Sequence, residues 1–121
     1  MSIYEFRTYT LKPGTVAQAE KNFGEALPNR IKVSPLAAFW HTEMGPLNQI
    51  IHVWEYENLQ HRADVRTQSV PGWPPKIQEF ILTMESEILD SSLTKPLKIF
   101  RKKIFTRARE NNVLFIFNFY I

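Results

Sequence analysis

Cysteine is absent from the 121-residue sequence, which excludes disulfide scaffolds, thiolate metal sites and cysteine nucleophiles. Glycine is scarce and scattered, so the sequence has no glycine-rich phosphate loop and we expect no nucleotide hydrolysis. It also lacks the run of about 18 apolar residues that a membrane-spanning helix requires. The first strand-like segment follows Met1 directly, and we therefore expect no signal or transit peptide in this chain.

The charged residues are distributed unevenly around a formal net charge of +3. Residues 1–89 contain 8 Lys and Arg against 10 Asp and Glu, whereas residues 90–121 contain 7 against 2. Phosphate binding needs basic residues clustered on one folded face, so we expect no nucleic-acid partner for residues 1–89. The length favours one domain, which we place at 1–89, followed by a basic extension at 90–121.

Hydrophobic periodicity and turn residues divide the domain into six main elements. We expect strands at 3–11, 36–44, 49–56 and 82–89, helices at 15–30 and 58–68, and a short helical piece near Lys76. Thr15 and Gln18 fit a capping box for the first helix, Pro28 should kink or end it, and Asn58 can cap the second.

This order predicts an α+β, ferredoxin-like βαββαβ fold, in which two helices cover one face of a four-stranded antiparallel sheet. The other face of the sheet then lacks a cover. Because Trp and Phe are numerous on the strands, we expect a second copy of the sheet to pack against it. The sequence therefore predicts a homodimer.

The connection at 45–48 reads as a tight hairpin loop. A four-residue loop would place Met44 opposite Gln49, and His41 would then lie directly across from His52.

Alternation along the strands predicts which side chains share a face. One face would carry an aromatic and polar set formed by Phe39, His41, Glu43, Ile50, His52, Trp54 and Tyr56. On the first strand, Glu5, Arg7 and Tyr9 share a face. We expect both sets to line a cavity between the two sheets of the dimer, where they would bind a small apolar or aromatic molecule.

The residues predicted to line this cavity allow three interpretations. His41 and His52 with Glu43 diagonal resemble a two-histidine, one-carboxylate metal site, but no HExxH-type motif supports it and we expect no metal. Alternatively, His52 or His41 is a catalytic base and Arg7 stabilises an enolate or phenolate. In the third interpretation the roles are structural: His52 and Trp54 hydrogen-bond within the sheet or dimer seam, and Glu5 and Arg7 form an ion pair.

Two arginines on the second predicted helix, Arg62 and Arg66, are four residues apart and could present an anion site. Exposed helical arginines more often pair with neighbouring carboxylates, here Asp64 or Glu57, and we favour that interpretation.

Four blocks of the sequence resemble the NIPSNAP domain of the dimeric α/β barrel superfamily. They are YEFRTYTLKPG at 4–14, ALPNRIKVSPLAAFW at 26–40, GPLNQIIHVWEYENLQHRADVR at 45–66 and ESEI at 85–88. The resemblance implies a ferredoxin-like protomer whose sheet faces that of a second copy. It singles out, without roles, Glu5, Arg7, Tyr9, Gly45, Asn48, His52, Trp54, Arg62 and Arg66.

The resemblance implies no settled enzymatic activity. Animal members of the family are associated with mitochondria, with vesicular transport and with the recruitment of autophagy adaptors, and they usually carry a presequence and a second domain copy. The wider superfamily includes cofactor-free monooxygenases, lactone isomerases and haem-handling enzymes, which keeps catalysis open by analogy.

The extension at 90–121 departs from the family pattern. Its first half is basic with apolar residues near helical spacing, which permits a helix on an acidic membrane surface. Its last nine residues, VLFIFNFYI, have the composition of an aggregation-prone edge strand. We favour the interpretation that the extension is poorly ordered or has no selected role.

Two function hypotheses follow. The first is a NIPSNAP-type dimeric module that binds a small molecule or protein adaptors, is mitochondrial or cytoplasmic, and uses no cofactor. The second is a cofactor-independent oxygenase or isomerase in the same cavity, with His52, His41 and Arg7 as catalytic candidates.

Overall fold

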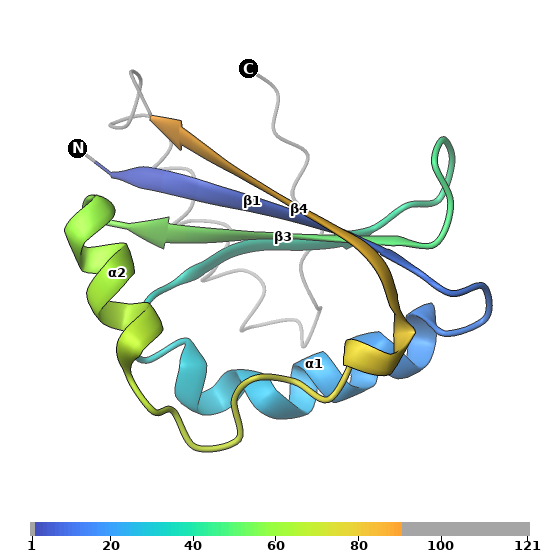
Figure 1. Ribbon diagram of the computed structural model, residues 1–121, viewed down its shortest axis with the longest axis horizontal. Coiled ribbons are helices and arrows are strands. Elements are labelled where there is room, and N and C mark those ends of the chain that lie inside the picture. Colours follow the sequence, from blue (N-terminus) through green and yellow to red (C-terminus); the bar gives the residue numbers. More distant parts are fainter. Residues whose placement is uncertain (1, 91–121) are drawn as a thin grey trace, which may run out of the picture.

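The computed structural model describes residues 2–90 of the chain. Its elements are β1 (Ile3–Leu11), α1 (Val16–Arg30), β2 (Leu36–His41), β3 (Gln49–Tyr56), α2 (Leu59–Thr67), a 3₁₀ turn (Gln78–Phe80) and β4 (Ile81–Asp90) (Figure 1). The predicted order agrees with these elements, and the predicted spans of the other strands and α-helices agree within one residue at each end, but the strand predicted at 36–44 ends already at His41. The predictions for the basic extension lie outside the described residues, apart from Asp90.

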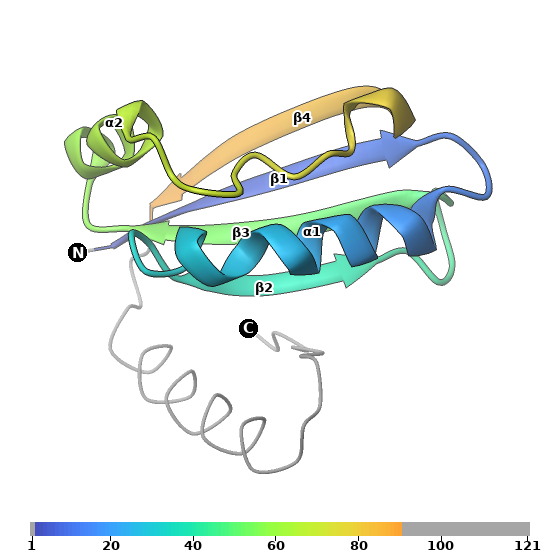
Figure 2. The ribbon, with the colours of Figure 1, turned by 90° about the horizontal axis from the view of Figure 1, so that it is seen from below.

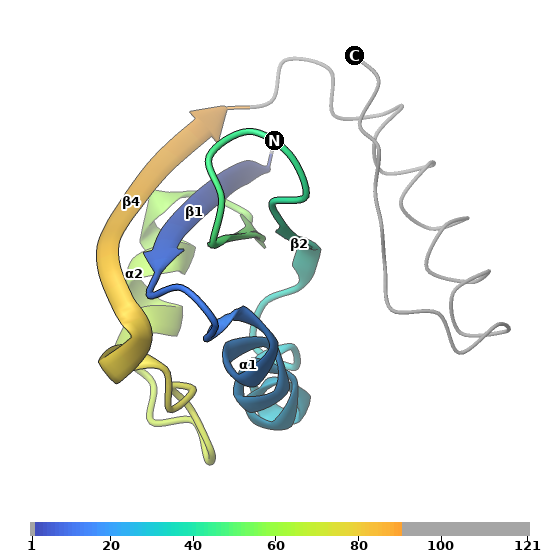
Figure 3. The ribbon, with the colours of Figure 1, turned by 90° about the vertical axis from the view of Figure 1, so that its right-hand side faces the viewer.

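The four strands form one antiparallel sheet in the order β2-β3-β1-β4. Both α-helices lie on the same face of this sheet, as the views from below and from the side show (Figures 2 and 3). The α+β ferredoxin-like βαββαβ fold predicted from the sequence is therefore confirmed. Within residues 2–90, no helix is long and apolar enough to cross a membrane.

The helix α1 begins and ends where the periodicity predicts, but the contacts at its two ends differ from the predicted ones. Thr15 occupies the N-cap without a side-chain capping bond, since its hydroxyl donates to the carbonyl of Lys12 at 2.6 Å. The expected capping box is therefore wrong. Pro28 lies within the helix, which continues to Arg30, and the bond from Ile31 N to the Leu27 carbonyl at 3.0 Å is retained. The proline removes one donor without ending the helix.

The predicted hairpin register is wrong by two residues. Phe39 lies opposite His52, and His41 lies opposite Ile50. The strand β2 ends at His41, and the longer connection contains Gly45 and Asn48 with positive φ of 95° and 61°. Because the shift is even, it leaves each side chain on its predicted face but separates His41 from His52.

The aromatic set of β3 packs against the protomer's own helices. His52 and Trp54 are both 2% exposed, and their ring centroids lie 4.9 and 6.4 Å from that of Phe23 on α1. The expectation that this face meets a second sheet is therefore wrong, and its side chains do not line a cavity between two sheets.

The physical reason lies in the crossover between parallel strands. Since β1 and β2 are both antiparallel to β3, they run parallel to each other, and α1 connects them. The handedness of this crossover decides which face the helix covers. Alternation in the sequence shows which residues share a face, but it does not show which face that is.

The opposite face of the sheet carries a second apolar cluster. Tyr4, Phe6 and Trp40 pack there against a small-residue centre formed by Ala37, Ala38 and Val53. Neither α1 nor α2 covers this helix-free face (Figure 3).

Candidate functional site

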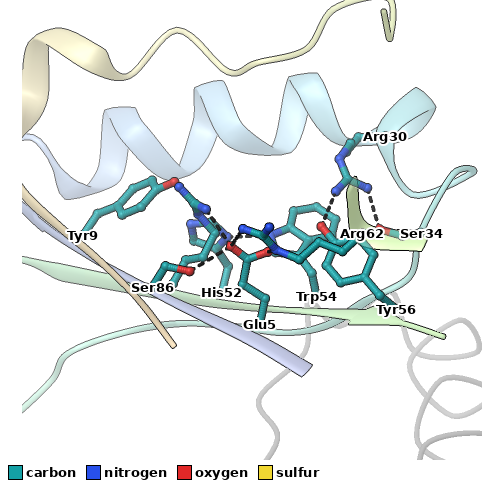
Figure 4. A network of polar contacts seen from close by, with 10 residues as sticks. Glu5, Tyr9, Arg30, Ser34, His52, Trp54, Tyr56, Arg62 and Ser86 are labelled. Atoms are coloured by element: carbon teal, nitrogen blue, oxygen red, sulfur yellow. Dashed lines mark hydrogen bonds and ion pairs between the residues drawn. The ribbon is translucent and has the colours of Figure 1, made fainter. Parts of the chain in front are cut away.

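Most of the predicted site residues gather between the sheet and the helices. Figure 4 shows a polar network there that draws on β1, β3, β4, α1 and α2. The predicted residues in this layer are Glu5, Arg7, Tyr9, Phe39, His52, Trp54 and Tyr56. The layer belongs to a single protomer, so its geometry does not depend on a second copy.

The carboxylate of Glu5 is the centre of the network and has no exposed surface. Its Oε1 accepts from Arg7 at 2.7 Å, from Ser86 at 2.8 Å and from Arg62 at 3.1 Å, and its Oε2 accepts from Arg62 Nε at 2.8 Å. Burial by itself would raise the pKa of Glu5, but these donors outweigh it and lower the pKa to about 2. Glu5 is therefore an ionised acceptor that joins β1, β4 and α2.

The predicted ion pair between Glu5 and Arg7 is confirmed. The prediction for Arg62 is wrong, because its guanidinium reaches Glu5 across the layer rather than a neighbour on its own helix. The sheet register pairs Arg7 with Ser86, and Ser86 and Arg62 of α2 both donate to Glu5. Arg66, one turn further along α2, is exposed.

His52 is held as a neutral imidazole. The indole N–H of Trp54 donates to His52 Nδ1 at 2.7 Å, so the proton of the neutral ring is on Nε2. Burial lowers the pKa of His52 to about 3, and the positive charge of Arg7 acts in the same direction. The predicted bond between His52 and Trp54 is thus confirmed.

Aromatic rings enclose the other side of His52. The Tyr9 ring lies edge-on with its centroid 4.8 Å away, and Phe39 stacks at 6.1 Å. No described residue accepts a hydrogen bond from His52 Nε2, which is buried. The only lone pair of the neutral ring is occupied by Trp54, so in this arrangement His52 has no free nitrogen to accept a proton.

The other charged group of the layer, Arg30 at the end of α1, was missed by the sequence analysis. It is 5% exposed and donates to Ser34 Oγ at 2.6 Å and to the Tyr56 hydroxyl at 2.9 Å. Its guanidinium carbon lies 4.2 Å from the Trp54 ring centroid and 5.4 Å from that of Trp73. A signal was present, because Arg30 continues the buried stripe of Ala19, Phe23 and Ala26 at helical spacing.

Two predicted residues lie apart from this network. His41 is 48% exposed and pairs through Nδ1 with Glu20 of α1, while the side chain of Glu43 is 89% exposed. They therefore do not join His52. Residues 2–90 contain no group of three His, Asp or Glu side chains that could hold a metal ion.

The NIPSNAP family profile matches residues 4–94, three quarters of the chain. The chain belongs to the NIPSNAP family. It is 41% identical over 66 residues to human NipSnap homolog 3B, which covers 54% of this chain and 27% of the relative. It is 29% identical over 99 residues to a NipSnap homolog of Dictyostelium discoideum, covering 80% of this chain and 44% of the relative. This NIPSNAP chain therefore spans less than half the length of these curated relatives.

Solved structures support the same assignment. A NIPSNAP family protein of Agrobacterium tumefaciens superposes with a TM-score of 0.70 at 28% identity, covering 80% of this chain and 99% of that one. A putative antibiotic biosynthesis monooxygenase of Nitrosomonas europaea superposes with a TM-score of 0.63 at 7% identity, covering 76% and 91%. The second likeness shows the fold alone.

The NIPSNAP residues named without a role in the sequence have structural positions here. Asn48 adopts a left-handed backbone and accepts from Leu11 N at 2.7 Å, and Gly45 supplies the other positive φ of the same connection. Arg62 binds Glu5. These residues shape the loop and the network.

Proposed function

We propose that this NIPSNAP domain is a homodimeric interaction module whose two copies pack through the helix-free face of the sheet. The observation that carries the proposal is the apolar cluster on that face, where Tyr4 and Phe6 pack against Val53. Within residues 2–90, both α-helices lie on the other face of the sheet (Figure 3). An aromatic face of a sheet meets water poorly, so burying it against another protein is favourable.

A second copy of the chain is the occupant that best fits this face. A two-fold interface brings the same patch from both subunits together, and a patch of rings around small residues can be self-complementary. The structural neighbours are of dimeric α/β barrel type, which supports the same pairing. A small apolar ligand held between the sheets would then contact Tyr4 and Phe6 rather than His52.

No contact among the described residues of the site specifically supports the oxygenase or isomerase hypothesis. Its base would be His52, whose acceptor nitrogen is occupied by Trp54, or His41, which lies away from Arg7 at the exposed end of β2. Its anion-stabilising group would be Arg7, which is engaged by Glu5 and by the Tyr9 hydroxyl. A role in binding and assembly is therefore the better supported proposal.

Sedimentation velocity of the full chain over a range of concentrations tests the module. We expect a concentration-dependent dimer, and we expect Phe6→Lys to raise its dissociation constant about 100-fold, because the charge would be buried against the second copy. In the separated subunit, the new lysine lies beside its cross-strand partner Glu87. Circular dichroism should therefore report an intact fold.

Leu47→Lys is the matched control. Leu47 lies in the connection between β2 and β3 and is 60% exposed, so the same added charge should leave the dimer unchanged. A wild-type chain that stays monomeric at every concentration would contradict the proposal. So would a folded Phe6→Lys variant that dimerises as tightly as the wild type.

Cellular location and partners follow from the family as part of the same proposal. We expect a mitochondrial or cytoplasmic protein that contacts protein adaptors through the folded dimer. Because the chain spans less than half of its curated relatives, these expectations extend to this chain only through the shared domain. Subcellular fractionation tests the location. Capture of autophagy adaptors by the wild-type chain, compared with capture by the Phe6→Lys variant, tests the partners.

A further inference from the structure

Arg30 is a buried cation with an incomplete set of partners. A guanidinium has five N–H donors, and Arg30 uses two of them, towards the neutral hydroxyls of Ser34 and Tyr56. No carboxylate among residues 2–90 lies within ion-pair distance of it. Buried charges in proteins are normally paired with an opposite charge, and Arg30 departs from this rule.

Among the described residues, no carboxylate of the surrounding layer pairs directly with Arg30. Its buried carboxylate, Glu5, has both oxygens occupied by Arg7, Arg62 and Ser86. The other buried carboxylate in the described chain, Glu55, lies elsewhere, where it accepts from Ser2. The layer between the sheet and the helices therefore contains three guanidinium groups for one carboxylate, which gives it an excess of positive charge.

The surroundings of Arg30 also define the shape of a partner. Its guanidinium lies over the flat indole of Trp54, and a second indole, Trp73, lies 5.5 Å from the first, measured between ring centroids. Trp73 belongs to the loop between α2 and the 3₁₀ turn and is only partly buried. This loop is fastened to α1 by side-chain bonds from Asn29 to the Pro71 carbonyl and from Asn22 to the Lys76 carbonyl.

We propose that Arg30 anchors a binding site for a small aromatic carboxylate. The carboxylate accepts from the N–H donors of Arg30 that have no partner, and the flat ring takes the place of the Trp73 indole against Trp54. A carboxylate matches the planar guanidinium better than a spherical anion does, because it can accept two parallel hydrogen bonds. Arg66, which is exposed on α2 and close enough to repel Arg30 electrostatically, adds positive charge near Arg30.

This site is separate from the proposed dimer interface, since it lies on the helix side of the sheet. A monomeric chain could bind the anion, and a dimer could fail to bind it, so the two proposals fail independently.

Titration of the ¹⁵N-labelled full chain with benzoate tests the site, with neutral benzamide as the matched probe. The three indole N–H signals report position, because Trp54 and Trp73 flank Arg30 while Trp40 lies on the opposite face of the sheet. We expect benzoate to shift the Trp54 and Trp73 signals saturably and to leave Trp40 unchanged. Benzamide should bind roughly tenfold or more weakly, because it lacks the charge.

Two substitutions complete the test. Arg30→Met keeps an unbranched side chain comparable to the aliphatic part of arginine and removes the charge, and it should abolish the benzoate shifts. Lys32→Met removes an exposed cation nearby, whose amine contacts only Asn29 among the described residues, and should retain them. The absence of saturable benzoate binding to the wild type would overturn the proposal, and so would equal affinity for benzamide or shifts confined to Trp40. These outcomes are decisive even if Arg30→Met fails to fold.

Discussion

Glu5 shows how one residue can require several distant parts of the chain. Its ligands come from β1, from α2 and from β4, and they are separated from it by 2, 57 and 81 positions in the sequence. A buried carboxylate is stable only when its acceptors are satisfied, so each of these contacts is part of the condition for folding.

Replacing this carboxylate by an amide should destabilise the fold. Glu5→Gln removes the charge and leaves Arg7 and Arg62 without their anion, for which we expect a loss of about 3 kcal/mol in the free energy of unfolding. Ser86→Ala removes one neutral donor and should cost only about 1 kcal/mol. Urea denaturation of both variants measures the difference, and equal small losses would show that the ion pairs contribute little.

His52 should make stability depend on pH near neutrality. A histidine in the unfolded chain has a pKa of about 6.5. Folding lowers the pKa of His52 to about 3. As the pH falls below about 6.5 the unfolded state binds more protons, so stability decreases by up to about 1.4 kcal/mol per pH unit. The contribution is fully present above that pH and is lost progressively down to the folded pKa.

The variant His52→Asn isolates this contribution. Its amide oxygen can still accept from the Trp54 indole, but it does not titrate. We expect its free energy of unfolding, measured with denaturant from about pH 7.5 down to about pH 5, where Glu5 stays ionised, to depend less steeply on pH than that of the wild type. An unchanged slope would assign the dependence to another group.

At the scale of single residues, the sequence predicts a contact correctly where the two partners are close in the chain. The Glu5–Arg7 and His52–Trp54 contacts both join positions two apart on one strand, and alternation alone brings them together. Arg30 and Arg62 were missed or misassigned, because their partners are set by how the helices lie over the sheet.

Among the elements, the connection between β2 and β3 departed most from its prediction. The sequence contains the alternating strands and a Gly-Pro turn, which favour a tight hairpin. The chain instead ends β2 at His41 and reverses through a longer loop in which Asn48 takes a left-handed conformation. Loop length depends on backbone geometry that residue types specify only weakly, whereas the extent of β1 and β3 follows from their composition.

Asn48 offers a test of this element. Asn48→Val should lower the free energy of unfolding by about 1–2 kcal/mol, because a β-branched side chain resists φ of 61°. Asn48→Gly should be neutral or slightly stabilising at the same position, since glycine adopts this φ freely. Thermal or urea denaturation distinguishes them, and equal effects would place the cost in the lost side chain rather than in the backbone.

For the whole molecule, the sequence predicted the order of elements and the family, but not which sheet face the helices cover. The alternation that groups His52 with Trp54 and Tyr56 is compatible with either side of the sheet. The connection through α1 between the parallel strands β1 and β2 decides between them, and that choice moved the polar network from a predicted dimer cavity into the protomer.

The central place of β1 also constrains how the protein is made. Among the described strands, β1 is synthesised before the other three, yet it pairs with β3 on one side and with β4, the last strand described, on the other. On the ribosome, β1 therefore lacks the partner for one of its edges until residues near 90 have left the exit tunnel. Translation arrest before that point would yield an intermediate with Glu5 lacking Ser86, a species suited to capture by chaperones.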